Sequence, residues 1–203
     1  MEIKERFGSS KSCLVTLGVT EEALIDVVLR GETLRDSATA FDPPTRGGFD
    51  AWAERVRALR ELFVPQKWTH DTPMGLPRIM SPDGEVAIIV ATGDAATGSA
   101  AMEPRTKRSI GPIVMHSVEA NQLGLFGDST RVSDGPITWV LLTHRVKGKE
   151  VVQAELSLPS TVDVENYVVG WETRWIFGSI PLDSPPKRDY EEPMKSIVNV
   201  KAR

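Results

Sequence analysis

The spacing of apolar residues changes along this chain, from a helical period in the first third to strand-like alternation later. Within residues 49–63 the apolar side chains recur in steps of 3 or 4 positions, at Phe49, Trp52, Val56, Leu59 and Phe63. This spacing predicts a helix with one apolar stripe. Residues 150–158 instead alternate between apolar and polar side chains, which predicts a strand with one apolar face. Because helical patterns come first and strand patterns follow, the order favours an α+β fold over alternating βαβ units.

Residues 1–68 are predicted to be helical. Thr20 is a suitable N-cap, and Glu21 and Glu22 follow where negative charge stabilises a helix N-terminus. An apolar face then follows at helical spacing, at Ile25, Val28 and Leu29. Residues 42–48 have the composition of a loop.

The helix over residues 49–63 is expected to end before Pro65, which cannot continue it. The positions of Arg55, Arg57 and Arg60 place these three cations off the apolar stripe.

Residues 80–180 are predicted to form mainly strands. The run Glu85–Ala91 is apolar enough for a buried strand, and Ile137–Val146 with Glu150–Leu158 predicts a hairpin whose turn is residues 147–149. A last strand is expected over Gly170–Ile180, where alternation places Trp171 and Trp175 on one face that packs against the 49–63 helix.

Together these patterns predict a single α+β domain over residues 1–180, with the N-terminal helices packed on an antiparallel sheet. Residues 181–203 are rich in proline and charge, and we expect an extended, proline-containing tail there.

Composition narrows the class of protein. The chain has 203 residues, 40% of them hydrophobic, which is enough for one sizeable core. Its net charge of −4 argues against a protein whose main task is gripping a phosphate backbone. One cysteine allows no internal disulfide, and no stretch approaches the ~20 apolar residues of a membrane span. These features predict a cytoplasmic protein that does not contact a membrane.

Residues 122–126 read Gln-Leu-Gly-Leu-Phe. This pentapeptide resembles the short peptide, Gln-Leu-x-Leu-Phe, by which many bacterial replication and repair proteins dock on the ring-shaped sliding clamp. The resemblance covers five residues of the chain, and all four defined positions match. It implies that the glutamine reaches a polar subsite while the apolar side chains fill a hydrophobic cleft. It assigns partner binding to Gln122, Leu123, Leu125 and Phe126.

An alternative for the same residues is that Leu123, Leu125 and Phe126 pack into the core. The flanking residues 119–121 and 127–130 are polar and typical of loops, which favours docking. The peptide is internal rather than terminal, so docking requires the surrounding segment to be exposed.

A basic loop precedes this pentapeptide. Its three cations lie within four positions, at Arg105, Lys107 and Arg108. They are expected to make weak contact with nucleic-acid phosphate beside the clamp, since a clamp-docked protein lies next to duplex DNA. The alternative is a solvated loop that contacts nothing.

Catalytic and metal-binding patterns are not found in the sequence. Residues 93–98 are glycine-rich and predict either a turn or an anion-binding loop, but they match neither a Walker motif nor a dinucleotide fingerprint. His70, His116 and His144 are too widely spaced to predict a metal site. No catalytic residue, cofactor or metal ligand is therefore assigned.

Three hypotheses follow. The first is a non-enzymatic accessory protein of bacterial DNA replication or repair, or of a mobile element, that docks on the sliding clamp through residues 122–126. The second is a structural or assembly protein without a nucleic-acid role, which binds another protein through a sheet face or the 49–63 helix. The third is a small enzyme with a site near residues 93–98 and His116 or His144. The oligomeric state is left open.

Overall fold

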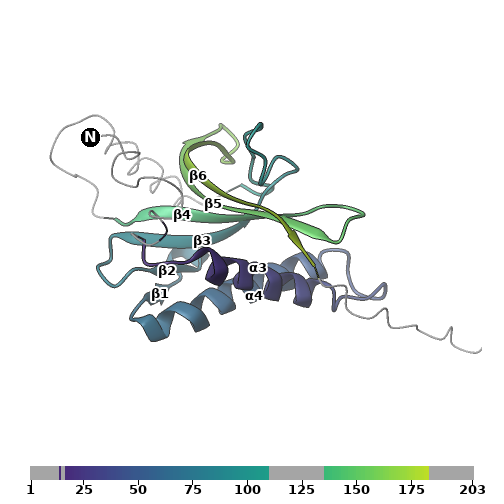
Figure 1. Cartoon of the computed structure of the whole chain (residues 1–203), viewed down its shortest axis with the longest axis horizontal. Helices are drawn as coiled ribbons and strands as arrows, with labels where there is room; N and C mark the ends of the chain where they lie inside the picture. The colour runs from purple at the N-terminus through teal and green to yellow at the C-terminus, as the bar shows by residue number, and fades with distance from the viewer. Residues whose placement is uncertain (1–13, 15–16, 110–134, 183–203) are drawn as a thin grey trace, which may run out of the picture.

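Two helices pack on one face of a six-stranded sheet in the computed structural model, which describes residues 14, 17–109 and 135–182 (Figure 1). The helices, both of which precede the strands, are α3 (Glu21–Arg35) and α4 (Arg46–Phe63). The strands are β1 (Thr69–Asp71), β2 (Arg78–Met80), β3 (Val86–Thr92), β4 (Ile137–Arg145), β5 (Val151–Val162) and β6 (Val168–Pro181). The α+β fold is therefore confirmed. None of the helices in the described part of the chain is long and apolar enough to cross a membrane.

Helix α3 begins where the sequence predicts. The Thr20 hydroxyl oxygen accepts a hydrogen bond of 3.2 Å from the Ala23 amide, which satisfies one of the free N–H groups at the helix start. The helix then buries Leu24, Val27 and Val28 completely. Burial of three aliphatic side chains holds this helix on the sheet.

Helix α4 begins earlier than predicted and ends, as predicted, before Pro65. It begins at Arg46, so the last residues of the expected loop are helical. It ends at Phe63, and Pro65 lies in the short 3-10 turn Val64–Gln66 that follows. Phe63 is buried, whereas Phe49 at the other end is 54% exposed.

Arg55 lies off the apolar stripe of this helix, and it is nevertheless buried. Arg55 is 1% exposed and forms an ion pair with Glu32 of α3, which is equally buried. The reason is that α4 packs against α3 as well as against the sheet, so its buried surface is wider than one apolar stripe. Gly31 allows the close approach, because a Cβ there would lie 2.6 Å from Cγ of Arg55 and 2.8 Å from the Ala51 carbonyl oxygen.

The strands follow one another in chain order across the sheet, from β1 to β6. The predicted hairpin is confirmed as β4 and β5, with Gly148 at a φ of +74° in its turn. Neighbouring strands are antiparallel, as expected, except that β3 and β4 run parallel. A parallel pair needs a connection that returns along the sheet, and residues 93–136 supply it.

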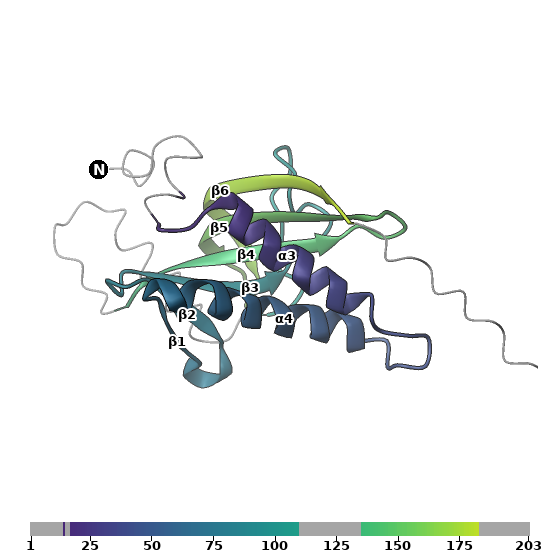
Figure 2. The same ribbon diagram turned by 60° about the horizontal axis from the view of Figure 1, so that its bottom comes forward.

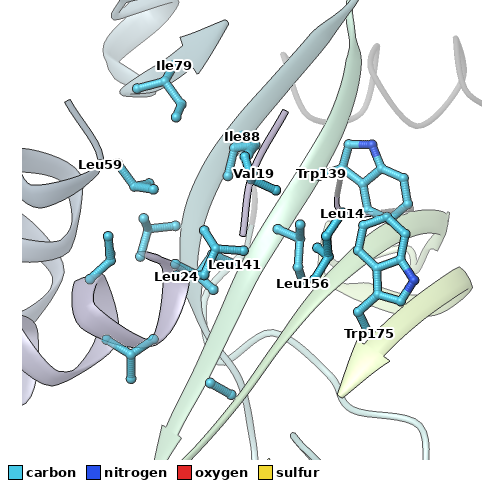
Figure 3. Close-up of a cluster of buried hydrophobic side chains, with 14 of the residues drawn as sticks. Leu14, Val19, Leu24, Leu59, Ile79, Ile88, Trp139, Leu141, Leu156 and Trp175 are labelled. Carbon is cyan, nitrogen blue, oxygen red and sulfur yellow. The ribbon is translucent and has the colours of Figure 1, made fainter. Parts of the chain in front are cut away.

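The main core lies between the helices and the sheet (Figure 3). Leu24 of α3 and Leu59 of α4 meet Ile88, Leu141 and Leu156 from the three central strands. At the β6 side, Trp139 and Trp175 stack with their ring centroids 4.4 Å apart and their planes 11° from parallel. This aromatic pair joins β4 and β6 within the same core as the helix side chains.

Trp171 and Trp175 are both buried, as expected, but they do not share one packing face. Trp175 belongs to the main core, whereas Trp171 packs with Val168 and Leu142 in a second cluster. The register between β5 and β6 shifts at Leu158/Pro159, and such a bulge changes the side of the sheet to which the following residues point. Pro181, expected to start the tail, is the last residue of β6, and residues 183–203 lie outside the described part of the chain.

Candidate functional site

The connection between β3 and β4 contains the glycine-rich segment, the basic loop, the pentapeptide and His116. His70 and His144 lie outside it, on β1 and β4. The first part of the connection, residues 93–109, lies over the face of the sheet that the helices leave open (Figure 1). The Trp171 indole N–H donates a 2.7 Å hydrogen bond to the Pro104 carbonyl. Thr106 and Val168 exchange two hydrogen bonds, each of 3.1 Å. This part of the connection is therefore fixed to β6.

A buried ion pair anchors the same segment at a second place. Glu155 on β5 is fully buried, and its carboxylate is 2.6 Å from the guanidinium of Arg174 on β6. Arg174 also donates to the carbonyl oxygens of Ser99 and Met102, at 3.0 Å and 2.8 Å. The Gly98 amide donates to the Glu155 carboxylate at 3.0 Å. The polar face of β5 is thus covered by protein.

The sequence patterns assign no site role to Glu155 or Arg174. The available signal is weak: both are charged residues in the middle of strands whose other face is apolar. Their pairing depends on a register shift between β5 and β6, and the sequence pattern carries no sign of it.

The structure separates the three cations of the basic loop. Arg105 is bound to two carboxylates, at 2.7 Å from Asp163 and 3.0 Å from Glu165, and its guanidinium lies 4.1 Å from the centre of the Tyr167 ring. Hydrogen bonds from the backbone of Tyr167 and Glu165, together with Arg105, hold the pKa of Asp163 below its usual range. Lys107 and Arg108 are exposed. Phosphate contact by this loop stays a prediction, and Arg105 already has two carboxylate partners.

His144 meets the glycine-rich segment. Its Nδ1 lies 3.2 Å from the carbonyl oxygen of Gly93, and the Asp94 carboxylate accepts from the Ala96 amide in the turn that follows. The contact that the enzyme hypothesis needs is one from histidine to a carboxylate or hydroxyl, whereas this one is to a backbone carbonyl. In the ranges that the structure describes, no group of three or more metal-ligating side chains is present. His70 is exposed on β1, and His116 lies outside the described residues.

The environment of His144 predicts a dependence of stability on pH. Burial, together with the positive charges of Lys107 and Arg35, lowers the pKa of His144, although the Gly93 carbonyl and Asp94 oppose this. As pH falls through about 6.5, the unfolded chain binds a proton that the folded protein does not, so the free energy of unfolding decreases. This decrease ends once pH falls below the folded pKa. Urea denaturation of wild type and His144→Gln at pH 8 and pH 5.5 measures it.

Other groups also titrate in the acid range, so the contribution of His144 is the difference between the stability losses of wild type and His144→Gln. We expect wild type to lose more stability than His144→Gln between the two pH values. Equal losses would show that His144 has the same proton affinity in the folded and unfolded states.

No protein-family model, curated protein or solved structure matches this chain. The structure itself defines the class: an α+β protein with two helices on one face of a sheet and residues 93–109 on the other. Gln122, Leu123, Leu125 and Phe126 lie in this connection but outside the described residues, so their docking role stays a prediction.

Proposed function

We propose that this protein is a non-enzymatic accessory protein of bacterial DNA replication or repair, or of a mobile element, that docks on the sliding clamp through residues 122–126. The observation that carries the proposal is the match of this pentapeptide to Gln-Leu-x-Leu-Phe at all four defined positions. Two or three apolar anchors at fixed spacing supply affinity, and one amide side chain fixes the register.

The exposure of the described residues on either side of residues 110–134 supports docking. Residues before it, Lys107 to Ser109, are exposed, and so is Gly135 after it. The chain therefore enters and leaves residues 110–134 at the protein surface. Hydrogen bonds from β6 hold residues 99–106, which precede the pentapeptide along the chain.

The exposed cations support a minor role for DNA. Lys107 and Arg108 precede the pentapeptide in the same connection and point into solvent. A clamp encircles duplex DNA, so a docked protein brings these charges near phosphate, where each can add a weak, salt-dependent contact. The chain's net charge of −4 limits such contact to this local site.

The test replaces the two C-terminal anchors of the peptide. Leu125→Ala with Phe126→Ala should weaken association with a purified bacterial sliding clamp by about 100-fold or more, because two apolar anchors are removed. Isothermal titration calorimetry measures the dissociation constant. The matched control is Met74→Ala with Val164→Ala, which removes two apolar side chains that are 82% and 100% exposed elsewhere. This control should bind the clamp as wild type does.

A synthetic peptide of residues 119–128 keeps the test valid if the double variant does not fold. We expect the peptide to bind the clamp and to compete with the full chain. Clamp binding that survives the double substitution, or a peptide that does not bind, would refute the proposal. Loss of folding in the double variant, with no binding by the peptide, would favour the core alternative.

A further inference from the structure

Four exposed cations lie at one end of the sheet, and we call them the cationic end: Lys107, Arg108, Lys147 and Lys149. Within residues 17–109 and 135–182, none of the four forms an ion pair. Two arginines beside them differ, because Arg105 is bound to two carboxylates and Arg145 is bound to Glu150 at 2.8 Å. The charges of the cationic end are thus free, in these ranges, to meet a partner.

Strand pairing brings the basic loop and the β4–β5 turn together. The Lys107 amide donates a 2.8 Å hydrogen bond to the Thr92 carbonyl at the end of β3, and Thr92 pairs with Thr143 of β4. Lys147 follows Thr143 by four positions, which is about 13 Å along an extended chain. The charge of Lys107 also acts on β4, because burial and then this charge lower the pKa of His144. Lys107 and Lys147 therefore belong to one surface, at the end of β3 and β4.

Hydrogen bonds fix the turn that carries Lys147 and Lys149. The Val146 amide donates to the Val151 carbonyl, and the Lys149 amide donates to the Val146 carbonyl, each at 3.2 Å. Gly148 supplies the φ of +74° that this turn requires. Figure 2 shows the turn projecting at the end of the sheet toward which α3 runs. Because the backbone is already ordered, a contact there orders only the two lysine side chains.

Exposed carboxylates lie at the opposite end of the protein. Glu22 is in the first turn of α3, about 20 Å along this 15-residue helix from its last turn beside Arg145. Asp83 precedes the seven residues of β3, which span about 23 Å. Near the cationic end, Asp94 offsets one of the four charges, since Glu150 is already paired with Arg145. The protein therefore has a positive end although its net charge is −4.

The composition of the cationic end indicates the kind of partner. Three of its four residues are lysines, and none of the four has an exposed large apolar side chain next to it in sequence. Protein–protein interfaces are depleted in lysine and use apolar anchors, whereas lysine binds phosphate as a point charge. No aromatic residue adjoins these cations in sequence, which argues against stacking on single-stranded bases.

We therefore propose that the cationic end binds the phosphate backbone of duplex DNA, and that Lys147 and Lys149 extend the contact beyond the basic loop. This inference rests on the DNA role proposed above, but it does not depend on residues 122–126. It assigns DNA binding to a hairpin turn that is distant in sequence from the pentapeptide.

Fluorescence anisotropy of a labelled duplex of roughly 20 base pairs, with the full chain and no clamp, tests the proposal at roughly 25 to 200 mM salt. We expect wild type to bind with a dissociation constant that rises with salt at a log–log slope of about 3–4, since each phosphate contact contributes about 0.9. Lys147→Gln with Lys149→Gln should lower this slope by about 2 and raise the dissociation constant about tenfold at the lowest salt. Both side chains are exposed in a turn, so the variant keeps the fold.

Lys67→Gln is the matched control for Lys147→Gln alone, because each removes one exposed lysine and changes the net charge equally. Lys67 precedes β1, which begins at the same end of the sheet as β3, away from the cationic end. Lys147→Gln should raise the dissociation constant about threefold, whereas Lys67→Gln should bind as wild type does.

Wild type that does not bind the duplex at the lowest salt would overturn the proposal. So would a double turn variant with an unchanged slope, or equal weakening by Lys67→Gln and Lys147→Gln. A polyglutamate peptide that displaces the labelled duplex as well as unlabelled duplex does, at equal charge, would assign the surface to an acidic protein instead. No clamp is present, so a failure of clamp docking through residues 122–126 would leave these results unchanged.

Discussion

Arg174→Met should lower the free energy of unfolding by about 3–5 kcal/mol, because it leaves the fully buried Glu155 carboxylate without its cation. Folded proteins of this size are stable by only about 5–15 kcal/mol, so the loss is a large share of the total. Urea denaturation followed by circular dichroism measures it. The carbonyl oxygens of Ser99 and Met102 also lose their donor, so limited proteolysis should cut near these residues faster than in wild type.

Two further variants show whether the stability loss comes from the unpaired Glu155 carboxylate or from removing any arginine. Glu155→Gln with Arg174→Met removes both charges and keeps an acceptor for the Gly98 amide, so it should recover much of the lost stability. Arg57→Met removes a 62% exposed arginine that also pairs with a glutamate, and should cost less than about 1 kcal/mol. Equal losses for Arg57→Met and Arg174→Met would contradict the explanation.

Glu32→Ala is expected to destabilise the protein by a similar amount, about 3–5 kcal/mol, because it leaves a buried charge between α3 and α4 without its partner. Glu32 is 1% exposed and pairs with three arginines, Arg35, Arg55 and Arg145. Arg35 and Arg145 can turn to solvent, but Arg55 is 1% exposed and stays buried. Burial already lowers the pKa of Arg55 to about 10, which shows how costly this charge is inside the protein.

The rescue is the double substitution Glu32→Leu with Arg55→Met, measured by the same urea denaturation. Replacing a buried ion pair by apolar side chains of similar volume is often neutral, so this variant should be at least 2 kcal/mol more stable than Glu32→Ala. A double variant as unstable as Glu32→Ala would show that the lost stability does not come from the unpaired Arg55.

The parts of the fold that the sequence predicts correctly depend on neighbours along the chain. The cap at Thr20 needs residues a few positions away, and the β4–β5 hairpin needs its own turn and alternation. What the sequence does not predict concerns distant partners. The burial of Arg55 depends on Glu32 in another helix, and the separation of Trp171 from Trp175 depends on a register shift against β5.

In the candidate site, too, contacts between residues far apart in the sequence are not predicted. The sequence groups three cations within residues 105–108, but it carries no sign that Asp163 and Glu165 bind Arg105 and so set it apart from the other two. These acidic residues come from the turn between β5 and β6, and folding alone brings them to the basic loop. Coverage of Glu155 by residues 98–102 has the same origin, because periodicity shows which face of a strand is polar but not what lies over it.

The parallel pairing of β3 with β4 has a consequence for synthesis on the ribosome. Strand β3 is a continuous apolar run, and the strand that covers its open edge is not made until residues 93–136 have been translated. At roughly 5–20 residues per second, this edge waits for several seconds after it emerges. During that time an apolar strand with unpaired N–H and C=O groups is open to other nascent chains. Ribosome stalling within residues 93–136 should therefore increase aggregation of the nascent chain more than stalling after β5.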